Sequence, residues 1–372
     1  MKRYCKKANI HDAGFICTAV LECLRKAVKR RRPDTIRLFA ELCGTTPGEA
    51  RVILEKCGKK YDAAVDKLVR IMVAELAAHR LTLPPIHVKE KVDGHSGKVR
   101  KISVQEIRQL LYDHVAVMAT AELGKLLGEH QVSGRKGMGL AYGHKLMRKW
   151  VTRARGKVYS VKLDIRHYYD SVDTARLMDW LRRRVKNDEL LWLVETLICT
   201  GERGLNIGSY LSHFLANLYL SDIWHAAMQR MSGVRHALFY MDDMVLIGPN
   251  KRKLAAAARQ VVEMVQAKGL DVKPGWQVHR ITRQHPLDVM GVRFSPRVQT
   301  LRKRIFRRAR RALLRVKRAL RGRRRLTHGM AMRTSAYHGW LVHSSCLAFR
   351  QRVGESASMK AIFQQLNPKT TC

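Results

Sequence analysis

Acidic residues are scarce in this sequence of 372 residues: 30 Asp and Glu stand against 72 Lys and Arg, and the formal net charge is +42. An excess of this size predicts a polyanionic partner such as a nucleic acid, although ribosome-binding proteins share it. The eight cysteines include no Cys-x-x-Cys pair. Their scatter excludes the pattern of a zinc ribbon or a compact disulfide framework, and it predicts reduced thiols.

Long apolar runs are missing as well. No stretch of about eighteen uncharged apolar residues occurs, and the short apolar run at residues 15–21 is followed at once by Glu22. We therefore expect no membrane partner, no signal peptide and a cytoplasmic location. The hydrophobic content of 46% nevertheless predicts a sizeable buried core, divided among two or three domains.

Two adjacent carboxylates, Asp242 and Asp243, lie between apolar runs at residues 239–241 and 244–247 that are typical of β-strands. A hairpin turn would hold both acids at an exposed tip, where carboxylate oxygens bind hard divalent cations. The alternative is an ordinary hydrated Asp-Asp turn, which is common. A third acid favours the metal site, because Asp164 ends an alternating strand at residues 158–164. Nucleotidyl transfer by two metal ions needs such a set of acids.

With these acids in place, the chain from about residue 84 onward resembles a reverse transcriptase. Further blocks occur in the order of that family. They are residues 98–102 and 133–137 in the fingers, residues 204–220 as the glycine turn and helix that support the template, residues 269–273 in the late palm, and residues 289–294 as the primer-gripping hairpin. The resemblance implies an α+β right-hand polymerase with fingers, palm and thumb.

The resemblance also implies roles for single residues. Asp164 and Asp242 would bind two Mg²⁺ ions, which Mn²⁺ could replace, with Asp243 as the supporting acid of the metal site. Contacts to the incoming deoxynucleotide are expected from Arg100, Arg135, Lys98 and Lys136, and Lys273 would protonate the leaving pyrophosphate. Contacts to template and primer are expected from Gly208, Ser212, His213, Asn217 and Gly291.

Tyr169 lies at the family position whose ring excludes a 2′-hydroxyl, which favours deoxynucleotides. Because side chains alternate along a strand, only one of Tyr168 and Tyr169 can face the site. Both could instead be half-buried aromatics at the end of a strand. An RNA-templated RNA polymerase is disfavoured by Tyr169. A non-catalytic RNA-binding scaffold is disfavoured by the three retained acids, which repel one another without a metal.

Three further blocks are similar to the reverse transcriptases of bacterial diversity-generating retroelements: residues 207–212, 275–278 and 338–340. That resemblance implies a structured template RNA, a cDNA or RNA primer, deoxynucleotides and a small basic accessory protein. His213 departs from the Gln that usually follows Ser212 in that group, so error-prone copying at adenines does not follow. Antiphage-defence, retron-like and intron-like enzymes remain alternatives.

Pro84 and Pro85 mark a domain boundary, since a proline pair cannot continue a helix. We predict a helical N-terminal extension at residues 1–83, fingers and palm at 84–295, and a basic helical thumb at 296–372. Local patterns further predict a helix that starts at Thr46, a fingers hairpin at 86–102, helices at 104–127 and 174–199, the latter covering the palm sheet, and a palm strand at 270–281. Within the extension, residues 43–69 resemble a three-helix ubiquitin-associated-like module; the alternative is a helical hairpin packed on the fingers.

Residues 301–326 predict a cationic helix, because this segment has many Lys and Arg and no acid. Apolar residues at helical spacing, Ile305, Leu313, Val316 and Leu320, would pack it against the rest of the thumb. A solvated charged face is the alternative. We expect instead that the helix contacts the phosphates of template and primer through Arg307, Arg308, Arg310 and Arg311.

Overall fold

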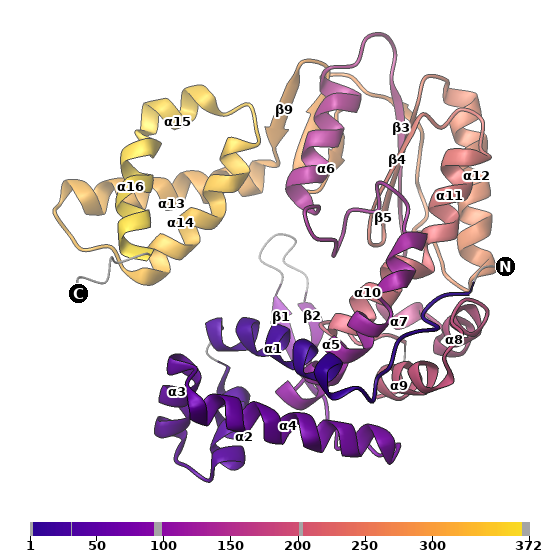
Figure 1. Ribbon diagram of the computed structural model, residues 1–372. Helices are drawn as coiled ribbons and strands as arrows, with labels where there is room; N and C mark the ends of the chain where they lie inside the picture. Colours follow the sequence, from indigo (N-terminus) through magenta and orange to yellow (C-terminus); the bar gives the residue numbers. More distant parts are fainter. Residues whose placement is uncertain (1–2, 31, 93–98, 201–203, 367–372) are drawn as a thin grey trace.

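The computed structural model describes residues 3–30, 32–92, 99–200 and 204–366. It has an α+β architecture with three regions (Figure 1). A helical N-terminal region lies below a central sheet, and a bundle of helices from the C-terminal part lies to one side of that sheet. No helix in the described ranges is both long enough and apolar enough to span a membrane.

The N-terminal region contains α1 (Ala13–Lys29), α2 (Pro33–Cys43), α3 (Pro47–Lys56) and α4 (Lys59–Ala77). The expected helix start at Thr46 is confirmed, because Thr46 and Glu49 form a reciprocal capping box. Helices α2, α3 and α4 contact one another, and α1 packs on α4 and on the fingers helix α5 (Ile107–Ala119). The N-terminal helices thereby share one hydrophobic core with fingers and palm.

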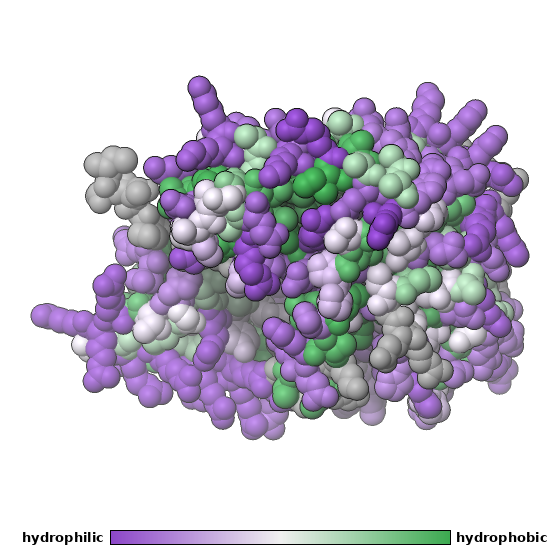
Figure 2. All heavy atoms as spheres, turned by 90° about the horizontal axis from the view of Figure 1, so that it is seen from below, coloured by the Kyte–Doolittle hydropathy of each residue, from purple (hydrophilic) through white to green (hydrophobic). Residues whose placement is uncertain are grey.

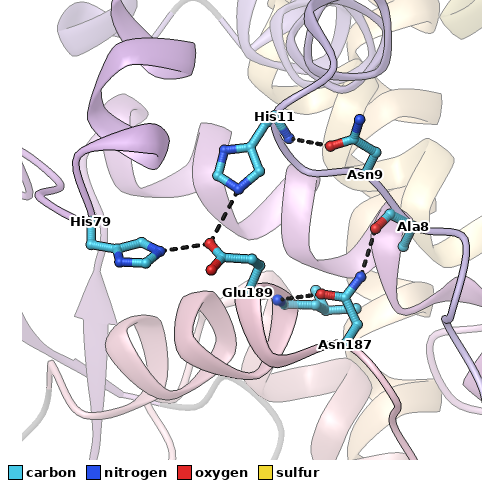
Figure 3. Close-up of polar contacts among 7 residues, drawn as sticks. Ala8, Asn9, His11, His79, Asn187 and Glu189 are labelled. Carbon is cyan, nitrogen blue, oxygen red and sulfur yellow. Dashed lines mark hydrogen bonds and ion pairs between the residues drawn. The ribbon is translucent and has the colours of Figure 1, made fainter.

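A short N-terminal arm joins this region to α9 (Asp188–Ile198) by polar contacts (Figure 3). Glu189 Oε2 lies 3.1 Å from Nε2 of His11 and 2.6 Å from Nε2 of His79. The Asn187 amide donates to the carbonyl of Ala8 at 2.6 Å, while its oxygen caps α9. Residues from three distant parts of the sequence therefore meet at the start of one helix.

The fingers begin with an antiparallel hairpin of β1 (His87–Val92) and β2 (Val99–Val104), as expected. The helix expected at 104–127 is shorter, because α5 ends at Ala119 and is followed by the 3₁₀ helix η1 (Ala121–Leu126). The Thr120 hydroxyl donates to the carbonyl of Ala116, and such a bond competes with the backbone hydrogen bonds of the helix. Next come α6 (Leu140–Met147) and the π-helix η2 (Arg148–Thr152).

The palm is a four-stranded sheet in the order β4-β5-β3-β6, built from β3 (Tyr159–Asp164), β4 (His236–Tyr240), β5 (Asp243–Gly248) and β6 (His279–Arg280). Both faces are buried. Met244 and Leu246 face the core that includes α11 (Ser221–Gln229) and α12 (Lys251–Ala267). Val245 and Ile247 alternate with them and face a second core beside η2.

Two expectations for the palm were wrong. Residues 270–281 are mostly not a strand: only a bridge from Ile165 to Val272 and the short β6 remain. Pro274 lacks a backbone donor and Gly275 weakens extended pairing, which accounts for the gap. The helix expected at 174–199 is two helices, α8 (Thr174–Arg182) and α9. The second packs on α5 and on α10 (Tyr210–Tyr219) and does not serve as a cover for the sheet.

The chain then forms a second, three-stranded sheet of β7 (Leu287–Val289), β8 (Val292–Ser295) and β9 (Val298–Leu301). The thumb helices follow as α13 (Lys303–Arg321), α14 (His328–Val342), α15 (Leu347–Val353) and α16 (Glu355–Leu366). Of the expected apolar stripe on α13, Ile305, Leu313 and Val316 are buried and Leu320 is partly buried.

Candidate active site

The three acids meet at one end of the palm sheet. Strands β4 and β5 are joined by the two residues Met241 and Asp242, and Asp243 begins β5. Met241 has a φ of 56°, a left-handed conformation that a side chain such as Met rarely adopts. The strained turn holds Asp242 at its tip. Asp164 lies directly opposite Asp243 in the register of β3 and β5.

Electrostatic repulsion is built into this arrangement, since like charges opposite each other destabilise a sheet. Burial, followed by the neighbouring Asp243 and Asp164, raises the pKa of Asp242 to about 6. Two lysines offset part of the repulsion. Lys273 Nζ donates to Asp164 Oδ1, and Lys162 Nζ lies 2.8 Å from Asp243 Oδ1 as an ion pair without hydrogen-bond geometry.

A divalent cation fits this chemistry. In the described ranges, no group of three or more His, Cys, Asp or Glu side chains already converges as a metal site. Two of the three acids are instead turned toward lysines. The donor set is nevertheless three carboxylates on adjoining backbone, and such oxygens are the ligands that Mg²⁺ prefers. A bound cation would replace the lysines as the partner of Asp164 and Asp243 and would relieve the repulsion around Asp242.

Tyr168 and Tyr169 do not lie on a strand, so the expectation from strand alternation was wrong. They begin the short helix α7 (Tyr168–Ser171), after His167 at a φ of 47°. The two rings still separate: Tyr168 is buried and its hydroxyl donates to the carbonyl of Ala216 at 2.6 Å. Tyr169 is half-buried, and its hydroxyl lies 3.3 Å from Nδ1 of His213.

His213 joins three parts of the site. Its Nε2 lies 3.4 Å from the Ser133 hydroxyl in the fingers segment, opposite the contact to Tyr169. The ring also closes over Gly134, where an added Cβ would meet Nε2 at 2.4 Å. Burial lowers the pKa of His213, so the ring is neutral at pH 7. A neutral ring that accepts from Tyr169 at Nδ1 carries its proton on Nε2, facing Ser133.

The residues expected to contact the triphosphate have different surroundings. Lys98 lies outside the described residues, and Arg100 is described only as a backbone position in β2. Lys136 is exposed. Arg135 is half-buried, and its Nη1 donates to the Gly128 carbonyl at 2.7 Å, so this guanidinium holds a turn of its own fingers segment in the present arrangement.

Three of the residues expected to contact template and primer lie just before α10 or within it: Gly208, Ser212 and Asn217. Gly208 has a φ of 110°, and an added Cβ would meet the carbonyl of Ser103 at 2.7 Å. Only glycine at this position lets the end of β2 come so close to the backbone before α10. Ser212 and Asn217 are buried, and the Asn217 amide donates to the Ser133 carbonyl at 2.8 Å. Their contact with a template stays a prediction.

The hairpin expected at 289–294 is confirmed as the turn between β7 and β8. Met290 and Gly291 both have positive φ, of 49° and 78°. An added Cβ at Gly291 would meet the Trp340 ring of α14 at 2.6 Å. Gly291 therefore lets the thumb pack against this hairpin, and its contact with a primer stays a prediction.

The comparisons with known proteins bear on this site. The model of the reverse transcriptase (RNA-dependent DNA polymerase) family matches residues 88–294, more than half of the 372 residues. The chain belongs to this family. All three acids of the site lie within the matched residues, and the arrangement in Figure 1 is that of a right-hand polymerase. Among curated proteins, no match was found.

Two solved structures of telomerases were also found. The apo telomerase from Candida tropicalis, truncated from its C-terminal domain, has 12% identity and a TM-score of 0.43, with 59% of this chain and 54% of that chain covered. The telomerase from Candida albicans in complex with a TWJ fragment of telomeric RNA has 12% identity and a TM-score of 0.45, with 76% and 55% covered. The reverse transcriptase chain spans about half the length of each.

Sequence reasoning missed two residues of this reverse transcriptase site. Asp113 is fully buried in α5, and its Oδ2 accepts from the Ser209 hydroxyl and from the backbone of Tyr210 and Leu211 at the start of α10. A single acid among the apolar residues of 107–119 was the available signal. Lys162 was detectable too, because it lies two residues before Asp164 on one strand and shares its face.

The thumb of this reverse transcriptase presents its cations on the side of α13 away from the buried stripe. Arg307, Arg310 and Arg311 are exposed and Arg308 is half-buried. A pocket of about 310 Å³ lies between α13 and α14, and Arg308, Arg311, Arg315 and Arg333 are among its lining residues. Figure 2 shows the lower face of the whole molecule, where hydrophilic side chains predominate and apolar residues lie between them.

Proposed function

We propose that this protein is an RNA-directed DNA polymerase that copies a template RNA into cDNA by two-metal nucleotidyl transfer. The observation that carries the proposal is the placement of Asp164 opposite Asp243, with Asp242 on the adjoining strained turn. The fold keeps these acids together although burial and repulsion raise the pKa of Asp242 to about 6. Carboxylates that are held close together despite their mutual repulsion are typical of a site that binds a cation.

Two Mg²⁺ ions, or Mn²⁺ in their place, would lower the pKa of the primer 3′-hydroxyl and neutralise the leaving pyrophosphate. Asp164 and Asp242 would hold both ions, and Asp243 would support them. Lys273 is exposed and pairs with Asp164, so it is close enough to deliver a proton to the leaving group. Arg100, Arg135, Lys98 and Lys136 are proposed to bind the triphosphate by charge-assisted hydrogen bonds.

The choice of sugar is assigned to Tyr169. Of the two tyrosines, only Tyr169 is partly exposed, and its hydroxyl faces His213 on the helix proposed to support the template. A ring held at that place would leave no room for a 2′-hydroxyl. Gly208, Ser212, Asn217 and Gly291 are proposed to shape the surface on which template and primer lie.

The finer proposal is a reverse transcriptase of a diversity-generating retroelement, in a bacterial or phage-infected cell, with a structured template RNA and a small basic accessory protein. Support comes from residues 207–212, 275–278 and 338–340, which are similar to that group. His213 replaces the Gln of that group, so we propose no bias toward errors at adenines. An antiphage-defence, retron-like or intron-like enzyme is the second candidate, supported by the same departure.

Synthesis on a primed RNA template tests the proposal. Purified protein with Mg²⁺ and deoxynucleotides should extend the primer into a product that deoxyribonuclease degrades and ribonuclease spares. RNA binding without any extension, under conditions in which the protein is folded, would favour the rival function of a non-catalytic RNA-binding scaffold. The strongly basic composition predicts RNA binding in either case, so extension is the decisive readout.

A further inference from the structure

A second cationic pocket lies at the end of the palm sheet remote from the acids. It has a volume of about 220 Å³, and its lining includes Lys149, Arg155, Lys157 and Arg235 together with Trp150 and His236. The connection from η2 to β3, at the top of Figure 1, contributes one side of it. The other side comes from the start of β4 and the end of β5.

The register of the sheet separates this pocket from the catalytic end. Tyr159 pairs with Gly248 at the pocket end of β3 and β5, whereas Asp164 pairs with Asp243 at the other end. At about 3.3 Å per residue, the length of β3 places the two sites about 17 Å apart. The triphosphate and the primer terminus at the acids therefore do not reach the pocket.

The charge of the pocket is uncompensated. The lining contains no Asp or Glu. Lys149, Arg155, Lys157 and Arg235 are all exposed, and none of them forms an ion pair within the described part of the chain. Four unpaired cations around one concave site attract an anion with several charges, and successive phosphates of a nucleic acid supply them.

The half-buried His236 ring lies in the wall of the pocket beside these cations, and the buried Trp150 ring lies behind it. The His236 ring stacks on the Trp150 ring with centroids 4.5 Å apart and an angle of 1° between the planes. Burial, with the nearby Arg235 and Lys149 contributing, lowers the pKa of His236 to about 4, so this ring is neutral at pH 7. Aromatic rings next to cations are the combination with which proteins bind single-stranded nucleic acid, because every base can stack.

We propose that this pocket binds a single-stranded segment of RNA outside the stretch being copied, with phosphates on Lys149, Arg155, Lys157 and Arg235 and a base against the His236 ring. The ligand is a nucleotide unit within a strand. The four cations of the pocket come from two separate segments of the protein, residues 149–157 and Arg235. This spread suits consecutive phosphates of a strand better than the single phosphate of a free nucleotide. The proposal rests on the proposed function only in taking the strand to be RNA.

Salt-dependent binding tests this surface. A short single-stranded RNA is titrated with wild-type protein and with a variant that carries Lys149→Gln, Arg155→Gln, Lys157→Gln and Arg235→Gln. The slope of log K against log salt should flatten by about 0.7 for each phosphate that the variant no longer neutralises. A control with the same change of charge carries Arg51→Gln, Lys56→Gln, Lys59→Gln and Lys60→Gln, four exposed positions on α3 and α4. Equal flattening in both variants would overturn the proposal, since the pocket would then contribute only net charge.

Photo-crosslinking of wild-type protein to RNA that contains 4-thiouridine gives a second readout, which holds even if the fourfold variant is poorly folded. Crosslinks are expected at residues 149–158 or at 235–236. Crosslinks confined to other parts of the chain would contradict the proposal, and loss of these crosslinks in excess AMP would assign the pocket to a free nucleotide instead. Neither assay contains primer or deoxynucleotides, so both outcomes are independent of whether the acids catalyse synthesis.

Discussion

The hydroxyl of Tyr169 lies 3.3 Å from Nδ1 of His213. This contact connects the residue proposed to select the sugar with the helix proposed to support the template. Tyr169→Ala should open space for a 2′-hydroxyl and raise the use of ribonucleotides relative to deoxynucleotides. The readout is the ratio of kcat/KM for the two sugars, which reports differential binding of the transition state.

The neighbouring tyrosine provides the control for that experiment. Tyr168 is buried, so Tyr168→Ala would leave a cavity and cost several kcal/mol of stability, whereas Tyr168→Phe removes only the hydroxyl. Tyr168→Phe should leave the sugar ratio unchanged. A ratio that moves with Tyr168→Phe and stays fixed with Tyr169→Ala would mean that the two tyrosines have been assigned to the wrong roles.

His213 is predicted to position Tyr169 rather than to act on the substrate directly. His213→Ala removes the partner of the Tyr169 hydroxyl, and Tyr169→Phe removes the hydroxyl itself. If the contact orients the ring, the two changes should be non-additive in the sugar ratio, with a coupling of about 1 kcal/mol, or roughly fivefold. Strict additivity in this double-mutant cycle would show that the contact has no part in sugar selection.

Asp113 is predicted to support the site through the start of α10. Asp113→Ala removes the acceptor of three donors, two of them in buried contacts, and should cost about 3 kcal/mol of unfolding free energy. Asp113→Asn keeps an acceptor oxygen and should cost less. Chemical unfolding of the three proteins at one pH gives these values, and an Ala variant as stable as wild type would contradict the assigned role.

The stability of the same variants should depend on pH. Burial raises the pKa of Asp113 from 3.8 to about 6, which means that the folded protein binds this proton more tightly than the unfolded chain. The contribution of this group is therefore full below about pH 4 and is lost as the pH rises through 6. Relative to wild type, Asp113→Asn should gain stability between about pH 4 and pH 7. A constant difference across that window would show that the carboxyl does not titrate there.

The basic face of α13 is predicted to bind phosphates without regard to sequence. Changing Arg307, Arg308, Arg310 and Arg311 to Gln should weaken RNA binding and flatten the salt slope by about 0.7 to 0.9 for each phosphate that is no longer neutralised. Unrelated RNA sequences should be affected alike. An unaltered slope would identify this run as a solvated face.

Much of the fold could be predicted from the sequence because the patterns that indicate its helices, strands and turns involve residues close together in the chain. The alternation around Asp164, the turn at Asp242 and the charged face of α13 each follow from short-range patterns. The contact of His213 with Tyr169 could not be predicted, since it joins residues 44 positions apart. The same holds for the Asp113 cap of α10. The strand expected at 270–281 failed because Pro274 and Gly275 interrupt the apolar pattern on which it was based.

Primer extension by Asp242→Asn tests the central claim most directly. Asn has nearly the size of Asp but lacks the charge that would hold the two metal ions. With Mg²⁺, deoxynucleotides and a primed RNA template, we predict that the variant loses at least about a hundredfold in rate, or roughly 3 kcal/mol of transition-state stabilisation, while it binds the RNA as tightly as wild type. Undiminished synthesis by Asp242→Asn would contradict the assignment of the catalytic site.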